Sequence, residues 1–458
     1  MLRFIKYIGS FLIIIFIIIC WYGFPIISGY GAKVMCSDVF VSHRDPENIR
    51  KIDLGFFPFS YGKYVVHYED SSVTGSFFGL AIKKAIYRTG LGATLINGIS
   101  EQQLRSQPIA VPFPIYENHT NVLWPNGDSI IKIIPSEINS RLLDSAADFC
   151  FKEKLNNESQ TRALIILYKG NIILEKYAPG YNSNSVLNGW SMSKSVINAL
   201  LGILVKNKKV DINATPVFPD WKNDPRNKIS ITDLMHMNSG LMWWEFYAGP
   251  SNVTNMLFDQ YDMGKYALRK SSIAEPGKVF NYSSGTANIL SYKIRRVLGD
   301  SNYYHFPAKE LFHKIGMYQT ILEPDASGTF IGSSFCYATA RDWARFGLLY
   351  LQDGIWNGER ILPEGWVKFS TSTSEKRSDK IWGKYGSLWW VNKGDSNNSK
   401  NRRYPDVPED CFSAMGFEGQ NIWIIPSKDL VVVRLSCEHD NKLDGNQFLV
   451  RVINSISK

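Results

Sequence analysis

The sequence predicts a mixed α/β domain whose first and last strands share one antiparallel sheet flanked by helices. Two strand–turn–strand patterns bracket the second half of the chain, one over 163–177 with a Gly170-Asn171 turn and one over 421–435. Stretches of helical character lie between them, including 193–206 and 340–352. Tight turns join antiparallel neighbours, and helices between two such hairpins must pack on the faces of the sheet. We therefore expect strands from both ends of this region to meet in one sheet.

Length and composition set the number of folded units. The chain has 458 residues, of which 45% are hydrophobic and 20% are charged, which excludes the disordered, collagen-like and disulfide-stapled classes. At roughly 150 residues per domain, two or three units are expected. We divide the chain into residues 1–29, a membrane anchor or signal; residues 30–140, an extension of unknown role; and residues 141–458, one large domain that carries the motifs for chemistry.

The N-terminal segment is predicted to reach a membrane. Residues 8–27 contain no charged side chain, and an uncharged run of about 20 residues is long enough to cross a bilayer as a helix. Arg3 and Lys6 precede the run. Positive residues stay on the cytoplasmic side, so the remainder is expected on the periplasmic or extracellular side. A cleaved secretory signal is the alternative, although residues 20–25 offer no small-residue cleavage site. Either segment would export the chain.

The charge balance argues against nucleic-acid binding. The chain has 51 basic and 42 acidic residues, a net charge of +9. The basic residues form short scattered groups, such as 206–209 and 400–403. Nucleic-acid binding requires a continuous basic face with interleaved aromatic residues, and the sequence has none. We predict a solvated basic surface beside an anionic envelope and no nucleic-acid partner.

The cysteines carry no metal-binding signature. None of the six forms a C-x-x-C pair or a Cys/His cluster with metal-ligand spacing, so we predict no metal and no cofactor. A disulfide is allowed in an oxidising compartment, but the five cysteines after the apolar run cannot all pair. Buried free thiols are the alternative. The residues concerned are Cys20, Cys36, Cys150, Cys336, Cys411 and Cys437.

The first candidate for chemistry is an S-x-x-K motif, Ser191 and Lys194, at the start of an apolar helical stretch. Residues three apart on a helix share a face, so the hydroxyl and the amine can meet. A serine becomes a nucleophile when a neighbouring base takes its proton, and Lys194 can do so only if burial lowers its pKa from about 10.4. The free N–H groups of the helix N-terminus suit an oxyanion. The alternative is an ordinary helix cap followed by a surface lysine.

Two later segments add possible partners. Tyr282, followed by Ser283 and Ser284, stands in a turn-like setting, and a phenol beside an ammonium can relay a proton. A packed tyrosine in a surface turn is the alternative. The glycine-rich segment 414–420 precedes the last hairpin, where a strand-edge N–H could complete an oxyanion hole. Those glycines could equally mark a bulge or turn.

Together these segments resemble the serine β-lactamase-like hydrolases, which include class C β-lactamases, low-molecular-weight penicillin-binding proteins, esterases and 6-aminohexanoate-oligomer hydrolases. The resemblance covers about residues 145–458. It implies a β-lactamase/transpeptidase-like α/β fold with a helical lobe, an acyl-enzyme on Ser191, and proton transfer shared by Lys194 and Tyr282. It also implies oxyanion N–H groups from Ser191 and Gln420, with Gly419 and Ser284 at the substrate. The three further matching stretches are 231–241, 338–347 and 385–390.

The departures from the family pattern bear on the substrate. The third motif of β-lactamases and transpeptidases usually starts with Lys or His, which binds the substrate carboxylate, whereas Phe417 aligns there. Ser284 replaces the more usual Asn. We therefore expect an exported serine hydrolase acting on a small-molecule ester or linear amide. A DD-peptidase or β-lactamase is the alternative, and a non-catalytic ligand-binding or sensor protein of the same fold is the second.

Other conspicuous residues have structural explanations. His236 lies in a Met-Asn-Ser-Gly turn and is expected to form a structural hydrogen bond. Trp243-Trp244 and Trp389-Trp390 either line a substrate groove or pack in the core. Arg341-Asp342 is expected to cap or pair on a helix and to contribute to stability.

Overall fold

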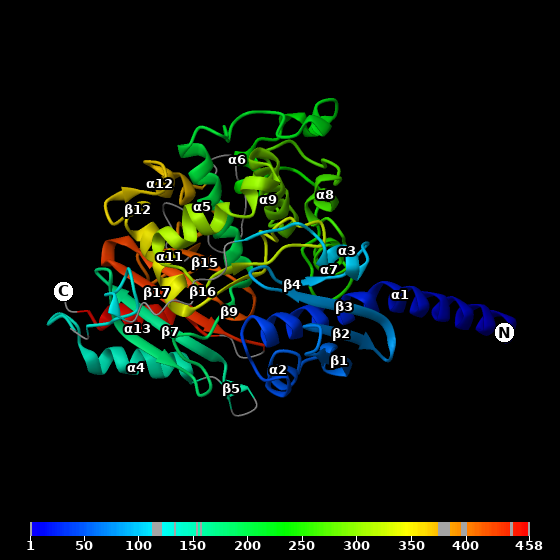
Figure 1. Ribbon diagram of the computed structural model, residues 1–458, viewed down its shortest axis with the longest axis horizontal. Helices are drawn as coiled ribbons and strands as arrows, with labels where there is room; N and C mark the ends of the chain where they lie inside the picture. The colour runs from blue at the N-terminus through cyan, green and yellow to red at the C-terminus, as the bar shows by residue number, and fades with distance from the viewer. Residues whose placement is uncertain are drawn as a thin grey trace.

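The protein is built around the predicted antiparallel sheet, with the strand order β14-β15-β16-β17-β7-β8 (Figure 1). The computed structural model describes residues 2–111, 121–131, 134–152, 154–155, 158–373, 385–394, 401–439 and 443–456. Strand β17 pairs with β7, with Val432 opposite Ile166, so the C-terminal hairpin joins the first hairpin as expected. The strands are β7 (Thr161–Tyr168), β8 (Asn171–Tyr177), β14 (Trp390–Val391), β15 (Phe412–Met415), β16 (Asn421–Ile425) and β17 (Leu430–Ser436).

Both faces of this sheet are buried, which explains why its strands are apolar without alternation. Ile165 and Leu167 of β7 point into the larger core, which includes α11 (Ala340–Leu351) and α5 (Ser193–Lys206). Leu164 and Ile166 point to the opposite face. That face is covered by two helices, α4 (Ser140–Phe151) and α13 (Gly445–Asn454).

A helical lobe stands on the α5 side of the sheet, as the resemblance implied (Figure 1). Its longest helix, α9 (Ser284–Leu298), packs against α5, α6 and α8. The shorter members are α6 (Ile231–Met235), α7 (Asn252–Asp259), α8 (Met263–Leu268) and α10 (Asp300–Tyr303). The other short elements are α3 (Glu101–Arg105), α12 (Trp366–Ser370), β5 (Lys154–Leu155), β6 (Glu158–Ser159), β9 (Leu187–Asn188), β10 (Ile321–Leu322), β11 (Cys336–Ala338), β12 (Ile355–Trp356) and β13 (Glu359–Arg360).

The N-terminal extension folds as a helix lying on a second, four-stranded sheet. Helix α1 (Leu2–Phe40) runs through residue 29 without a break and is followed by α2 (Pro46–Ile52). A Cβ on Gly75 would lie 2.4 Å from the Ser28 carbonyl oxygen of α1, so this glycine permits the close approach of sheet and helix. The strands are β1 (Gly62–His67), β2 (Ser72–Phe77), β3 (Leu80–Arg88) and β4 (Gly92–Leu95). The division of the chain near residues 29 and 140 stays a prediction.

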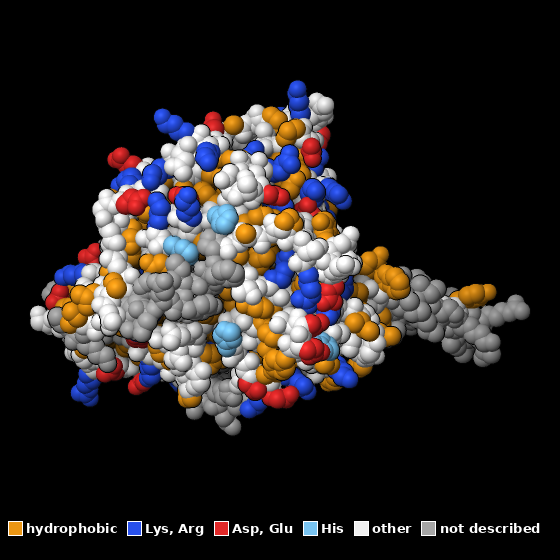
Figure 2. All heavy atoms as spheres, viewed as in Figure 1, with side chains coloured by type: hydrophobic (Ala, Val, Ile, Leu, Met, Phe, Trp, Pro, Cys, Tyr) orange, Lys and Arg blue, Asp and Glu red, His pale blue; other side chains and the backbone are white. Residues whose placement is uncertain are grey.

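The predicted membrane span lies within α1, whose free end projects from the molecule (Figure 1). Among the residues that the structure describes, no helix combines the length and apolarity needed to cross a bilayer. The side chains of residues 8–19 lie outside that part, and the prediction of a membrane helix is not supported. All six cysteines are free thiols. On the face shown in Figure 2, the Lys and Arg side chains are scattered among acidic side chains.

Candidate active site

Ser191 lies in a tight turn, η3 (Trp190–Met192), directly before helix α5. The turn forces Trp190 into the left-handed region at φ 46°, and the Trp190 N–H donates to Asn188 Oδ1 over 2.9 Å. A Cβ on Gly189 would lie 2.3 Å from the Trp343 ring. The turn therefore requires glycine at 189, and it presents the Ser191 hydroxyl at the N-terminus of an apolar helix.

Lys194 lies one helical turn after Ser191 and is 1% exposed. Its Nζ is 2.9 Å from Ser191 Oγ, 3.1 Å from Ser284 Oγ and 3.0 Å from the Ser333 carbonyl oxygen. Burial lowers the pKa of Lys194 to about 8, although the charge of Glu245 opposes the shift. About one-tenth of this amine is therefore neutral at pH 7 and about half at pH 8, and the neutral form can accept a proton from Ser191.

Tyr282 completes the group around the serine. Its hydroxyl is hydrogen-bonded to the Ser191 side chain, and Lys194 Nζ lies 4.9 Å from the centroid of its ring. Burial, reinforced by the charge of Glu245, raises the pKa of Tyr282, so the phenol keeps its proton. The structure thus brings together the three side chains singled out from the sequence. Lys194 has the properties of a base and Tyr282 those of a proton donor.

The loop that carries the tyrosine is held by the 236–240 turn. The Asn281 N–H donates to the Met237 carbonyl over 2.7 Å, and the Asn281 side chain donates to the Trp243 carbonyl over 3.0 Å. His236 is buried and lies 3.0 Å from Ser387 Oγ through Nε2. This contact fits the structural role expected for His236.

Glu245 belongs to the site and was missed by the sequence reasoning. Its carboxylate accepts from the Ser284 N–H over 2.9 Å and from the Ser284 hydroxyl, which in turn accepts from Lys194. Tyr247 and Trp243 also donate to it, over 2.8 Å and 2.5 Å. The N-terminus of α9, where Ser284 lies, favours a bound carboxylate. Glu245 is the sole acidic residue in 241–250, but a single acidic residue in a sequence does not indicate a functional site, so the sequence offers no sufficient signal for it.

The glycine-rich segment forms the loop between β15 and β16, with η9 (Phe417–Gly419) inside it. A Cβ on Gly416 would lie 2.2 Å from the Gly189 carbonyl oxygen, so this loop runs directly against the turn that carries the serine. The Phe417 ring is 5.5 Å from that of Trp190 and 6.1 Å from that of Tyr247. Phe417 is 41% exposed and offers an apolar surface beside the nucleophile.

Gly419 and Gln420 hold this loop in place. The Gln420 carbonyl accepts from the Gly416 N–H over 2.8 Å, and its side-chain Oε1 accepts from the Ser436 N–H of β17 over 3.0 Å. Gly419 has a left-handed φ of 79°. Within the described residues, no hydrogen bond joins Gly419 or Gln420 to Ser191. An oxyanion role for the Gln420 N–H stays a prediction.

The paired tryptophans divide between packing and the site. Trp389 is buried and packs in the core, whereas the ring of Trp390 stacks on Tyr282 at 5.4 Å. Trp243 is buried and hydrogen-bonded to the Glu245 carboxylate, while Trp244 is exposed. One member of each pair therefore contacts the catalytic group or its support.

Arg341 and Asp342 serve the fold, as expected. The Arg341 guanidinium pairs with Glu175 of β8 at 2.7 Å, and Asp342 pairs with Arg345 at 3.1 Å within α11. The Asp342 N–H donates to the helix cap Thr339 over 3.0 Å. These contacts join α11 to the edge of the sheet.

Comparison with known proteins identifies the family to which the fold and the motifs around Ser191 belong. The sequence profile of the beta-lactamase family matches residues 153–447, more than half of the chain. The 6-aminohexanoate-dimer hydrolase of Paenarthrobacter ureafaciens is 24% identical over 307 residues, covering 62% of this chain and 74% of that one. A Bacillus anthracis protein provisionally named a 6-aminohexanoate-dimer hydrolase superimposes with a TM-score of 0.54 at 20% identity, covering 76% of this chain and 86% of its own. A family VIII carboxylesterase superimposes with a TM-score of 0.52 at 15% identity, covering 72% and 99%.

Proposed function

The chain belongs to the beta-lactamase family, and from this premise we propose that it is a serine hydrolase that cleaves an ester or a linear amide through an acyl-enzyme on Ser191. The observation that carries the proposal is the 2.9 Å contact between the Ser191 hydroxyl and a buried lysine of lowered pKa. A serine held by such a base is an activated nucleophile. A protein that merely captured a ligand would have no use for this pair.

The reaction follows from the positions of the three side chains. Lys194 takes the hydroxyl proton as Ser191 Oγ attacks the carbonyl carbon of the substrate. The resulting oxyanion is stabilised by the Ser191 N–H at the start of α5 and by a second N–H from the 416–420 loop. When the intermediate collapses, the departing alcohol or amine takes a proton from Tyr282, which recovers one from Lys194. A water molecule then attacks the carbonyl carbon of the acyl ester and gives a proton to Lys194, which returns it to Ser191 Oγ as the ester bond breaks and the acid is released.

The preference for an ester or linear amide rests on the loop beside the nucleophile. Phe417 stands where β-lactamases and transpeptidases carry a cation for the substrate carboxylate, and its ring packs between those of Trp190 and Tyr247. An aromatic surface favours an apolar acyl or leaving group over a carboxylate. The names of two relatives, a dimer hydrolase acting on an amide and a carboxylesterase, agree with this substrate class.

Labelling of the purified protein with a fluorophosphonate probe tests the proposal. We expect an adduct on Ser191, hydrolysis of chromogenic p-nitrophenyl esters, and loss of both in Ser191→Ala. Ser195→Ala is the matched control, because Ser195 lies four residues further on, in helix α5, and its hydroxyl donates to the Leu388 carbonyl. Absence of an adduct on a folded protein would count against the serine hydrolase. A stable adduct with fluorescent penicillin, without ester turnover, would instead support the DD-peptidase.

We also propose that the catalytic domain lies outside the cytoplasm. The support is the uncharged run 8–27 preceded by Arg3 and Lys6. Fusion of alkaline phosphatase to the C-terminus should give an active reporter, because this enzyme folds only after export. If alkaline phosphatase were inactive in this fusion, and a reporter enzyme that works only in the cytoplasm were active in the same position, the result would contradict the proposal.

A further inference from the structure

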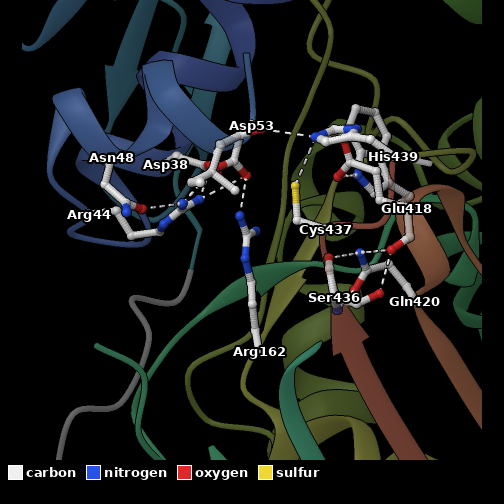
Figure 3. Close-up of polar contacts among 12 residues, drawn as sticks. Asp38, Arg44, Asn48, Asp53, Arg162, Glu418, Gln420, Ser436, Cys437 and His439 are labelled. Carbon is white, nitrogen blue, oxygen red and sulfur yellow. Dashed lines mark hydrogen bonds and ion pairs between the residues drawn. The ribbon is translucent and has the colours of Figure 1, made fainter. Parts of the chain in front are cut away.

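A second cluster of chemically capable side chains lies where the 416–420 loop meets the end of strand β17. Glu418 comes from that loop, while Cys437 and His439 follow directly on strand β17. One ligand atom of each residue lies within 4.8 Å of the other two. Figure 3 shows the Cys437 thiol directed at the His439 ring with Glu418 beside them. The cluster plays no part in the chemistry proposed for Ser191.

The geometry within the cluster is that of metal ligands. Cys437 Sγ is 3.3 Å from His439 Nε2, close to the separation of about 3.5 Å between sulfur and nitrogen ligands on a tetrahedral zinc ion. Glu418 is 8% exposed and Cys437 is 1% exposed, so these two ligands are shielded from water, while His439 is half-buried. Glu418 adopts the left-handed conformation (φ 60°, ψ 24°), in which its side chain turns inward rather than toward solvent.

The Glu418 carboxylate has no cation in contact among the described residues. Its one hydrogen bond there comes from the Trp190 indole N–H, over 3.2 Å. The nearby guanidinium groups are committed elsewhere, since Arg162 pairs with Asp53 at 2.7 Å and Arg44 pairs with Asp53 at 2.5 Å (Figure 3). A buried carboxyl group with a single hydrogen bond can take a metal ion as a further partner.

We propose that Glu418, Cys437 and His439 bind a zinc ion. Thiolate and imidazole ligands select zinc over magnesium or calcium, which prefer all-oxygen sites. Zinc takes four ligands, and the Ile52 carbonyl oxygen, 2.9 Å from His439 Nε2, lies beside the cluster. In the bound state Nε2 gives up this contact to bind the ion, and the carbonyl or a water molecule fills the fourth position.

The ion would have a structural role at the junction of three segments. It would join the 416–420 loop, which carries Phe417, to the end of strand β17. The Ile52 carbonyl at the end of α2 lies beside this junction. Phe417 and Glu418 are neighbours in the chain, so fixing Glu418 fixes the wall of the substrate site. The ion would act on the shape of that wall and take no part in acyl transfer.

Cobalt substitution tests the site in the full-length chain without a polyhistidine tag. Addition of Co²⁺ to the chelator-treated protein should produce sulfur-to-cobalt charge-transfer absorption and the strong visible bands of a tetrahedral ion. Cys437→Ser should abolish the charge-transfer band and weaken binding by more than about 100-fold. Cys411→Ser, a buried thiol outside the cluster, is the matched control and should leave the spectrum unchanged. A spectrum that is absent, or the same in Cys437→Ser, would overturn the proposal.

Zinc analysis gives a second, independent measurement. The purified protein should hold one zinc ion per chain, and a hundredfold excess over Kd should raise Tm by about 3–5 °C. Both effects should be lost in His439→Ala, while circular dichroism shows the fold retained. If zinc is substoichiometric and leaves Tm unchanged, the three residues do not form a metal site. The serine hydrolase is tested separately, by ester hydrolysis with the zinc-free protein. Activity there would support the mechanism on Ser191 even if no zinc site exists.

Discussion

Two buried lysines, Lys194 and Lys33, occupy opposite situations in this molecule. Lys194 meets two serine hydroxyls and a carbonyl, and its nearest carboxylate, Glu245, is reached only through Ser284. Lys33 of α1 forms a direct ion pair with Glu323 and also donates to the Ala93 carbonyl over 2.6 Å. Burial lowers the pKa of both amines, and a carboxylate opposes the shift at each. Glu245 acts on Lys194 through its charge alone, whereas Glu323 acts on Lys33 through its charge and a direct hydrogen bond.

The difference shows that burial alone does not make a lysine a base. A carboxylate in direct contact stabilises the ammonium form and commits the lysine to structure. A carboxylate one hydroxyl away leaves the amine able to release and recover a proton within the working pH range. The pair at Lys33 instead fastens the N-terminal helix to the catalytic domain, because Glu323 also accepts from Ser37 of α1 and from the Ala93 N–H of β4.

The largest effect is expected for the catalytic lysine. Lys194→Met should lower kcat/KM for ester substrates by about 10³–10⁴-fold, because the base that activates Ser191 is lost. The temperature of thermal unfolding should be unchanged or shifted upward, since a buried amine without a carboxylate in direct contact is removed. Steady-state kinetics and calorimetry on the same preparation provide the check. A large loss of stability would show that Lys194 is structural, like Lys33, and would break the comparison.

The structural lysine should behave in the reverse way. Lys33→Met leaves Glu323 buried without its cation, and it should lower the free energy of unfolding by about 3–5 kcal/mol. The double variant Lys33→Met/Glu323→Gln should recover part of this loss. Lys83→Met, which removes a partly exposed pair with Asp259, is the matched control and should cost about 0–1 kcal/mol.

Denaturant unfolding measures these differences, and titration of active sites with the fluorophosphonate corrects for unfolded protein. The kcat per folded molecule should stay within about twofold of the parent in all three variants, because none of these residues touches Ser191. A selective fall in kcat with unchanged stability would assign Lys33 to the active site and contradict the comparison.

How far the sequence anticipates these two sites depends on the spacing of the residues involved. Ser191 and Lys194 lie one helical turn apart, so helix geometry alone predicts that they meet. The hairpins that build the sheet are equally local. The Tyr282 contact spans about 90 residues, and only the order of the family motifs made it predictable.

The remaining contacts have no local signature. Lys33 and Glu323 are 290 residues apart, and neither lies in a motif that would indicate its partner. Glu245 follows two tryptophans in an irregular segment, and the proposed zinc ligands combine a C-x-H pair with a glutamate from another loop. Tertiary packing decides such pairings, and a single chain without the fold does not reveal them. For the same reason the sequence predicts only an anchor or signal for residues 1–29 and gives no role to residues 30–40, although the second half of α1 packs in the core.

The pH dependence of activity sharpens the comparison further. In the proposed mechanism the neutral form of Lys194 is the active one, and burial lowers the pKa of this amine to about 8. Log kcat/KM should therefore rise with pH, with a slope of one below pH 8 and a plateau above it, a change of about 100-fold between pH 6 and the plateau. A pH–rate profile with a stable ester provides the measurement. A flat profile from pH 6 to 10 would exclude Lys194 as the titrating base.

The smallest effect, and the most discriminating one, is expected at Glu245. Its negative charge raises the pKa of Lys194, so Glu245→Gln should move the midpoint of the pH profile downward by up to about one unit. Glutamine retains hydrogen-bonding atoms for Ser284, so kcat on the plateau should change only a few-fold. Glu175→Gln, on β8 and paired with Arg341 away from the site, should leave the midpoint in place. If Glu245→Gln moved the midpoint upward, or abolished the plateau, Glu245 would not be acting by its charge through Ser284. The distance of a carboxylate from a buried amine would then not be what separates the catalytic lysine from the structural one.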